Sequence, residues 1–219
     1  MNSTRRMTRT PLLLVGGTAM ALVLAGCGSS DHSSSTASHG SPSASSSSTS
    51  SFGPAAAGPH NAADVAFATD MVPHHAQAVE MANMALDTTS NAEIKTLAQA
   101  IQGAQDPEIR IMSGWLQGWG AKVPTSGAGH SMGGMSGVGG TGMMSADQMA
   151  ELDKAEGATF DRLWVEMMTE HHTGAIAMAK TELADGDNAE AKALAQTIIS
   201  AQTAEVATLN GLAKTLPQK

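Results

Sequence analysis

The chain has 219 residues, of which 42% are hydrophobic and 3% aromatic, and it carries 12 Lys and Arg against 20 Asp and Glu. This length is short for two full-sized domains. The formal net charge of −8 argues against binding to nucleic acid and against adhesion to anionic lipid, because both need a basic protein surface.

Residues 1–26 have the pattern of a lipoprotein signal peptide. Basic residues precede the apolar run PLLLVGGTAMALVLAG, which is interrupted by glycine and ends directly before Cys27. A transmembrane helix needs about 20 apolar residues, so this run favours a cleaved signal. Cys27 is the single cysteine, and we expect it to be lipidated. The pattern therefore predicts a lipid anchor at the cell membrane, on the extracytoplasmic face. An unprocessed signal anchor with an incidental cysteine is the alternative.

Residues 27–60 predict a disordered tether. Their Ser, Gly, Ala, Pro and Thr composition offers almost no large apolar side chain with which to bury a core. The folded part is therefore expected to begin near Asn61. Removal of the leader would leave nine basic residues against 20 acidic ones, a net charge near −11.

An internal repeat organises the rest of the chain. A shift of 97 positions aligns residues 64–109 with 161–206 without a gap, and 19 of these 46 positions are identical. Such a match indicates two copies of one supersecondary unit. Alanine and leucine are abundant and apolar residues recur at spacings of three and four, which favours helices over strands.

Each copy reads as a helical hairpin, so the sequence predicts an all-α, antiparallel four-helix bundle over residues 61–214. The expected helices span 62–87, 91–119, 145–184 and 188–214. Repeat 1 covers 62–120, a Gly/Met-rich loop covers 121–144, and repeat 2 covers 145–214.

Capping boxes are expected where helices start, with a short polar side chain and a Glu or Gln three residues later. The pairs are Ser90 with Glu93, Asp187 with Glu190, and Ser145 with Gln148. The third helix is expected either to begin at Ser145 and continue or to break near Gly157.

Two histidine pairs occupy equivalent places in the repeats, in MVPHHAQAVEMA at 71–82 and MTEHHTGAIAMA at 168–179. At about 100° per residue, both pairs share a helix face with apolar residues, within an arc of roughly 120°. The first arc contains Asp64, Phe67, Met71, His74, His75, Ala78 and Met81, and the second contains Asp161, Trp164, Met168, His171, His172, Ala175 and Met178. Glu80 falls outside the first arc, and Glu166 and Glu170 fall outside the second. The histidines should therefore face the core.

A buried imidazole without a partner costs about 1 to 3 kcal/mol for each unsatisfied group, so a ligand is expected at these pairs. Neutral imidazole and thioether donors without thiolate favour copper, especially Cu(I). The candidate metal ligands are His74, His75, His171, His172, Met71, Met168, Met81 and Met178. The alternative is that the histidines hydrogen-bond within the core and that the methionines only pack. For Met81 and Met178, packing is nearly as plausible as ligation.

Pro73 precedes the first pair, where the second copy has Glu170. Inside a continuous helix it would kink the chain beside the site. Alternatively, the helix restarts there with Pro73 in its first turn, which would remove Asp64 and Phe67 from the histidine face.

The repeated pattern Asp-x-x-aromatic-x-x-x-Met-x-x-His-His-x-x-Ala-x-x-Met-Ala, at 64–82 and 161–179, resembles the signature of the domain of unknown function 305 family. The stretch IRIMSGWLQGWG at 109–120 resembles the end of that family's second helix. The resemblance implies a ferritin-like helical bundle, usually exported, with some members that bind copper in the periplasm. The eight His and Met candidates are the binding residues that it implies.

The loop between the repeats contains a Met-x-x-Met pair, Met132 and Met135, together with His130, Met143 and Met144. Thioethers on a flexible Gly-rich backbone can hold Cu(I) or Ag(I), so we interpret this loop as a second, shallower site, with a plain linker as an equal alternative.

Three functions are consistent with these patterns. The favoured one is a non-enzymatic, lipid-anchored protein that buffers or sequesters copper and passes it to a partner. A ferritin-like metal oxidase is the second. Di-iron bundles use Glu-x-x-His pairs, however, and in this sequence no Glu stands three residues before any His. The third is a structural or interaction bundle of the cell envelope without metal.

Overall fold

The computed structural model describes residues 58–124 and 142–217, and within them it has five α-helices and no strand. The helices are α1 (Ala62–Thr88), α2 (Ala92–Gly118), α3 (Ala146–Lys154), α4 (Gly157–Asp185) and α5 (Ala189–Thr215). The all-α prediction is confirmed. The signal peptide, most of the tether and most of the Gly/Met-rich loop lie outside the described residues, and with them Cys27, Met132 and Met135.

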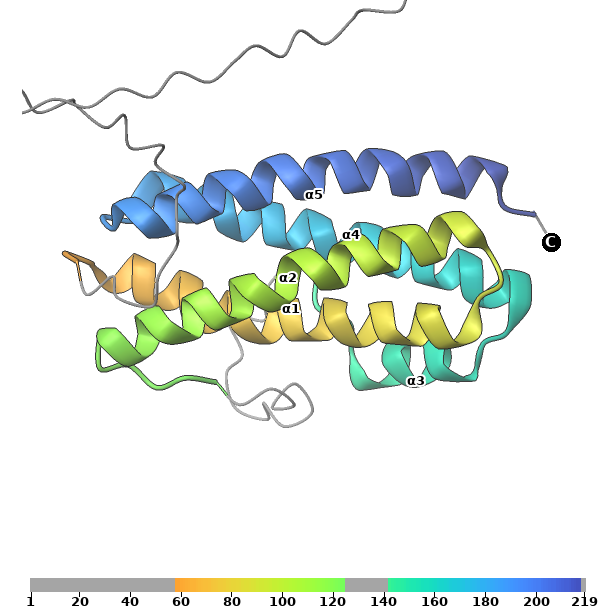
Figure 1. The fold of residues 1–219 in the computed structure, drawn as a ribbon, viewed down its shortest axis with the longest axis horizontal. Coiled ribbons are helices and arrows are strands. Elements are labelled where there is room, and N and C mark those ends of the chain that lie inside the picture. The colour runs from red at the N-terminus through yellow and green to blue at the C-terminus, as the bar shows by residue number, and fades with distance from the viewer. Residues whose placement is uncertain (1–57, 125–141, 218–219) are drawn as a thin grey trace, which may run out of the picture. The chain divides into compact units, whose positions relative to one another are not determined.

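Four long helices form two antiparallel hairpins, one in each repeat. Short turns at residues 89–91 and 186–188 connect α1 to α2 and α4 to α5, and the two hairpins meet where α1 packs against α4 (Figure 1). Trp164 Nε1 donates a hydrogen bond to the main-chain oxygen of Met81 at 2.8 Å, near the end of α1. Asp64, at the start of α1, lies instead against the start of α5. The two central helices are therefore antiparallel.

The helix caps differ in part from the prediction. Asn91 and Asn188 are the N-caps of α2 and α5, and each side chain accepts hydrogen bonds from two main-chain N–H groups of the first turn. The boxes expected at Ser90 and Asp187 are wrong by one residue. Asparagine caps a helix as well as serine or aspartate does, and each helix begins one residue later than the capping boxes required. The box of Ser145 with Gln148 is confirmed.

The third predicted helix is broken in two, as the glycine suggested. α3 ends at Lys154, and α4 begins at Gly157, whose φ of +54° lies in the left-handed region that favours glycine. Pro73, by contrast, lies inside a continuous α1, so Asp64 and Phe67 stay on the histidine face. Both of these residues are buried.

None of the described helices is both long enough and apolar enough to cross a membrane. Their apolar side chains form two buried clusters instead. One contains Met81, Trp164 and Met168 and includes Leu152 of α3, and the other contains Met71. The inner faces of α1 and α4 contribute to both clusters.

Asp64 is a buried carboxylate that ties α1 to the turn before α5. It accepts main-chain hydrogen bonds from Asn61 at 2.6 Å and from Asn188 at 2.9 Å. Burial works to raise the pKa of Asp64, but the hydrogen bonds that it accepts, above all those from Asn61 and Asn188, bring it below its usual value. Asp64 is therefore suited to remain ionised in the interior.

Glu182, near the end of α4, is buried next to Asp64 and behaves in the opposite way. Burial, and then the hydrogen bond and the negative charge of Asp64, raise the pKa of Glu182 to about 8. Gly186 leaves room for this carboxyl pair, because a Cβ there would lie 2.2 Å from Glu182 Oε1 and 2.8 Å from Asp64 Oδ1. Glu182 thus holds a proton at neutral pH.

The pair predicts that the protein loses stability as Glu182 ionises. The folded-state pKa of about 8 lies above the usual 4.5, so between these values the folded state holds a proton that the unfolded state has released. The free energy of unfolding should therefore fall as the pH rises toward about 8, and Glu182→Gln should abolish that fall. Urea denaturation between about pH 7 and pH 9, above the range in which ordinary histidines titrate, measures the effect.

Glu80→Gln, at an exposed position of α1, is the matched control and should behave like the unmodified protein. A Glu182→Gln variant whose stability declines over this pH range as steeply as that of the control would contradict the assignment.

Candidate metal centre

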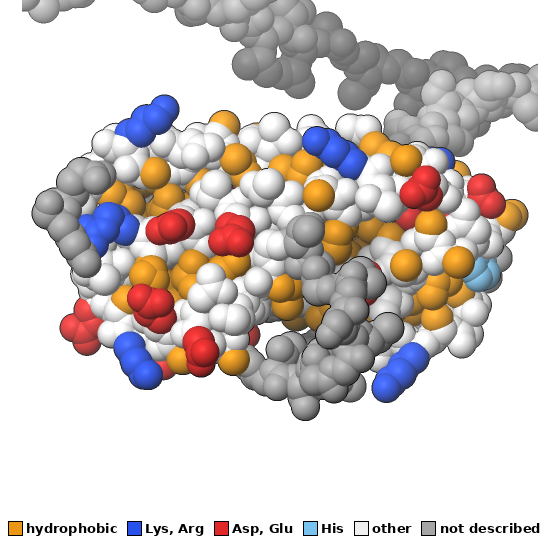
Figure 2. Space-filling model, turned by 180° about the vertical axis from the view of Figure 1, so that it is seen from behind, with side chains coloured by type: hydrophobic (Ala, Val, Ile, Leu, Met, Phe, Trp, Pro, Cys, Tyr) orange, Lys and Arg blue, Asp and Glu red, His pale blue; other side chains and the backbone are white. Residues whose placement is uncertain are grey.

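The two histidine pairs lie at the middle of the α1–α4 contact and are fully enclosed. His74 and His75 on α1, and His171 and His172 on α4, are each 0% exposed. The predicted burial of this face is confirmed, and Glu80, Glu166 and Glu170 are exposed, as their position on the helix indicated. On the face of the molecule shown in Figure 2, hydrophobic, uncharged and scattered charged side chains form the surface.

One histidine of each pair meets its counterpart across the seam. The ring centroids of His74 and His171 are 3.7 Å apart, with the ring planes inclined by 38°. The two repeats therefore bring their inner histidines to a single place at the centre of the bundle. His172 lies farther out, with its ring centroid 6.3 Å from that of His171.

The outer histidine of each pair contacts a carboxylate from the second helix of its own hairpin. His75 Nε2 is 2.8 Å from Glu108 Oε2, and His172 Nε2 is 2.8 Å from Glu205 Oε2. The histidine rings are buried, whereas the Glu108 and Glu205 side chains keep 13% and 17% exposure. The carboxylates thus connect the buried rings to the surface.

Polar atoms without hydrogen-bond partners are concentrated around these rings. They include both ring nitrogens of His171, Nδ1 of His75 and Nδ1 of His172. Gln105, one turn before Glu108, leaves Nε2 and Oε1 without partners, and the equivalent Gln202 leaves Oε1. Each such group costs about 1 to 3 kcal/mol in an apolar interior, so the site destabilises the bundle unless something binds there.

The inner imidazole of the second pair, His171, is held neutral. Burial lowers the pKa of His171 well below its usual range, and the neighbouring imidazoles, His74 first, lower it further. A neutral imidazole keeps a lone pair on one nitrogen and can therefore ligate a metal ion without first releasing a proton.

The four methionine candidates on the helices do not share one environment. Met71, Met81 and Met168 are 0% exposed, whereas Met178 is half-buried. Met81 belongs to the cluster that includes Leu152 of α3, and this short helix has no counterpart in the first repeat. Thioether sulfur is therefore present in the bundle interior on both α1 and α4, and Met178 is the least enclosed candidate.

The end of the Gly/Met-rich loop is fastened beside the histidines. The Gln77 side chain bonds the main chain of Met144 twice, donating to its oxygen at 2.9 Å and accepting from its N–H at 2.7 Å. Gly142, with φ +96°, lies so close to α4 that a Cβ would stand 2.6 Å from the main-chain oxygen of Glu170 and 3.0 Å from Gly174 Cα. Gln77 and Gly174 each stand one turn after an inner histidine. Residues 142–144 therefore cover the seam at the level of the site.

Among the described residues, no three His, Cys, Asp or Glu side chains are gathered closely enough to form a metal site by themselves. A metal ion at the paired histidines would thus need methionine sulfur in addition to imidazole, or a movement of side chains. The residue types fit a soft ion, for which thioether and neutral imidazole are suitable donors.

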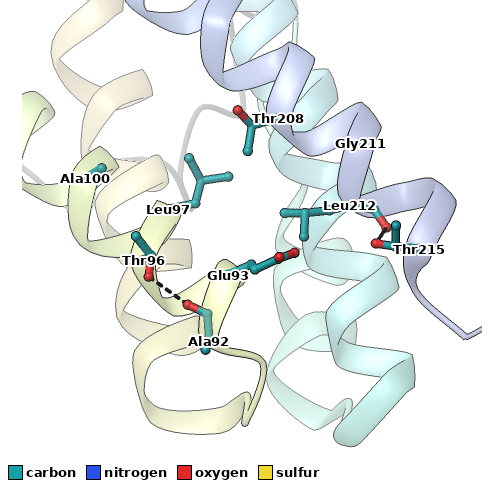
Figure 3. A pocket seen from close by; sticks show the side chains of 9 residues that line it. All are labelled: Ala92, Glu93, Thr96, Leu97, Ala100, Thr208, Gly211, Leu212 and Thr215. Carbon is teal, nitrogen blue, oxygen red and sulfur yellow. Dashed lines mark hydrogen bonds between the residues drawn. The ribbon is translucent and has the colours of Figure 1, made fainter. Parts of the chain in front are cut away.

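An open groove of about 640 Å³ lies away from the histidines, between the start of α2 and the end of α5 (Figure 3). Leu97 and Leu212 face each other across it, and Thr96, Thr208 and Thr215 are among its other lining residues. It contains no histidine or methionine, so it offers none of the imidazole or thioether donors that suit Cu(I).

Four residues near the paired histidines were not predicted from the sequence, namely Glu108, Glu205, Gln105 and Gln202. All four belong to the 19 positions that are identical in the two repeats, and each glutamate follows the outer histidine by 33 residues. This identity was a usable signal, because polar residues retained at the same places on both second helices mark a feature that the two repeats share.

The model of the family described as "Domain of unknown function (DUF305)" matches residues 64–213. The chain belongs to this family. No protein of curated function matches it. The match covers both histidine pairs, both glutamates and both hairpins of this DUF305 protein.

Solved structures of similar proteins share the fold. A DUF305 protein from Streptomyces coelicolor, described as secreted, is 32% identical over 68% of this chain and 89% of its own, with a TM-score of 0.61. A DUF305 fragment from Deinococcus radiodurans is 28% identical over 73% of this chain and 100% of its own, with a TM-score of 0.63. CopM in its Cu(II)-bound form is 32% identical over 69% of this chain and 95% of its own, with a TM-score of 0.58. CopM has also been solved in Cu(I)-bound, Ag-bound and apo forms.

The partnerless ring nitrogens predict that His171→Leu will not destabilise the metal-free protein. The substitution removes two unsatisfied polar atoms and keeps a side chain of comparable size, so we expect the free energy of unfolding to stay the same or to rise by about 1 kcal/mol. Urea denaturation in the presence of a chelator measures this.

Thr89→Val is the matched control, since the Thr89 hydroxyl donates to the buried Asp161 carboxylate. This variant should lose about 1 to 3 kcal/mol, because it leaves a satisfied group without its partner. A loss of similar size in His171→Leu would mean that the histidine is structural.

Proposed function

We propose that this DUF305 protein binds copper, most favourably Cu(I), and that it buffers or sequesters the ion outside the cytoplasm without catalytic turnover. The observation that carries the proposal is the concentration of partnerless polar atoms on the buried histidines. A metal ion would use the lone pairs that the protein itself leaves unsatisfied, and binding energy would offset the cost of burying them.

The donors proposed for the ion are His74, His75, His171 and His172, supplemented by thioether sulfur from Met71 and Met168. The antiparallel contact of α1 and α4 supports one shared centre, because it places the inner rings of the two repeats 3.7 Å apart. Met81 is a candidate further along the seam, and Met178 is a weaker one because it is half-buried. Met132 and Met135 are proposed as a separate, shallower acquisition site in the loop.

Copper is supported by the donor chemistry and by similarity. Imidazole and thioether without thiolate favour Cu(I), and CopM, which has the same fold, has been solved with Cu(I), Cu(II) and Ag. The protein from Streptomyces coelicolor is described as secreted, which agrees with an extracytoplasmic location. We further propose that lipidated Cys27 anchors the chain to the membrane and that the ion passes to a metal-transfer partner.

A ferritin-like oxidase has less support. The carboxylates that reach the site, Glu108 and Glu205, each contact the Nε2 atom of an outer histidine and keep some exposure. Di-iron bundles instead direct several carboxylates at the metal itself.

The proposal predicts tight capture of Cu(I) by the purified protein. In an anaerobic titration against a chromophoric Cu(I) chelator, the unmodified protein should withdraw stoichiometric copper, with Zn(II) and Cu(II) titrated for comparison. The variant with alanine at all four paired histidines should fail to compete. Failure of the unmodified protein to compete for any of these ions, or retention of tight binding by the four-fold variant, would contradict the bundle site.

Two further variants test whether a loss of binding comes from misfolding and whether the tight site lies in the loop. A Met132→Ala, Met135→Ala variant should keep the tight site, and His171→Leu should weaken it while remaining folded. The unfolding temperature of the unmodified protein should rise with Cu(I), since a free ion concentration of 100 times Kd adds about 2.7 kcal/mol to the free energy of unfolding.

A further inference from the structure

The repeated contact between an outer histidine and a glutamate assigns a role to two residues that are not themselves metal donors. Glu108 lies 2.8 Å from His75 Nε2, and Glu205 lies 2.8 Å from His172 Nε2. The first copy contains Pro73 and Pro107 next to this contact, and the second has Glu170 and Ala204 in their places. The same distance is kept despite different backbone chemistry.

The contact defines where the imidazole proton lies. An ionised carboxylate can only accept hydrogen bonds, so at 2.8 Å the Nε2 atom of each outer histidine must donate. Both glutamate side chains keep partial exposure, 13% and 17%, and so remain in contact with solvent.

The other ring nitrogen distinguishes the two tautomers of each outer ring. Nδ1 of His75 and Nδ1 of His172 are buried and have no hydrogen-bond partner. A proton on Nδ1 would be a buried N–H without an acceptor, which is costly. The contacts therefore favour the tautomer with the proton on Nε2 and a lone pair on Nδ1.

We propose that Glu108 and Glu205 are positioning residues, which hold His75 and His172 in the Nε2–H tautomer and so make Nδ1 the atom that each ring offers to a metal ion. That Nδ1 binds a metal ion rests on the proposed function, whereas the tautomer of the two rings does not depend on it. The inner histidine of the second pair differs, because neither ring nitrogen of His171 contacts a carboxylate. Each pair thus contains one ring that a carboxylate orients.

The tautomer is measured directly in the metal-free protein. Long-range ¹H–¹⁵N correlation spectra distinguish protonated from unprotonated ring nitrogens, and the purified, chelator-treated protein should show protonated Nε2 and unprotonated Nδ1 for His75 and His172. Finding Nδ1 protonated in either ring, whether in the other neutral tautomer or in imidazolium, would overturn the proposal.

Substitution of one glutamate uses the repeat as an internal control. In Glu108→Ala, His75 should become a mixture of tautomers, while His172, still paired with Glu205, should keep its spectrum. Glu108→Gln should restore the Nε2–H form of His75, since an amide oxygen can still accept from it. An unchanged His75 spectrum in Glu108→Ala would overturn the positioning role.

The affinity for Cu(I) then tests whether these histidines bind the metal ion. Loss of a carboxylate partner of a ligating histidine typically weakens metal binding roughly 10- to 100-fold, so Glu108→Ala should weaken Cu(I) capture by that factor and Glu108→Gln by less. Glu80→Ala should have no effect, because Glu80 is exposed on the outer side of α1.

The outcomes separate the two proposals. Predicted tautomers with unchanged Cu(I) affinity in Glu108→Ala would overturn the donor assignment alone. Predicted tautomers with no Cu(I) binding by the unmodified protein would overturn the proposed function while supporting the Glu–His pairing.

Discussion

The antiparallel contact between α1 and α4 fixes the positions of the two inner histidines relative to each other. Trp164 bonds to Met81 near one end of the seam, Asp64 is held at the other, and the rings of His74 and His171 meet between them. A displacement of one helix by a single turn would move these rings about 5.4 Å along the axis. Small buried residues such as Ala78 and Ala175 line the same face. The register of this seam is therefore what makes a shared site possible.

The centre reduces stability in the apo protein, and the rest of the bundle compensates. Partnerless imidazole and amide atoms lie within a core that has few aromatic side chains, and Trp115, Trp164 and Phe160 are the largest that it buries fully. Natural proteins commonly accept such local conflicts at functional sites, where a ligand removes them. The alternative of a purely structural histidine cluster would predict satisfied ring nitrogens, whereas Nδ1 of His75 and Nδ1 of His172 have no hydrogen-bond partner.

The two repeats are equivalent at the outer histidines and different around them. Asp64 is paired with Glu182, whereas its counterpart Asp161 accepts from the Thr89 hydroxyl. Gln77 anchors Met144, whereas the equivalent Gly174 makes room for Gly142. Residues 142–144 therefore contact both α1 and α4. The duplicated unit thus supplies the histidine–glutamate contact twice, and the divergent positions determine how the histidines are covered.

The sequence by itself determined the helical hairpins, the repeat, the burial of the histidine face and the break at Gly157, because these depend on local periodicity and on residues close together in the chain. It misplaced the caps at Ser90 and Asp187 by one residue, since neighbouring Asn, Ser and Asp are nearly equivalent as caps. Only the tertiary structure decided that His74 meets His171 and that Glu108 and Glu205 reach the outer rings. Those contacts depend on the register between helices, which is set by how complete surfaces pack and not by spacing along any one of them.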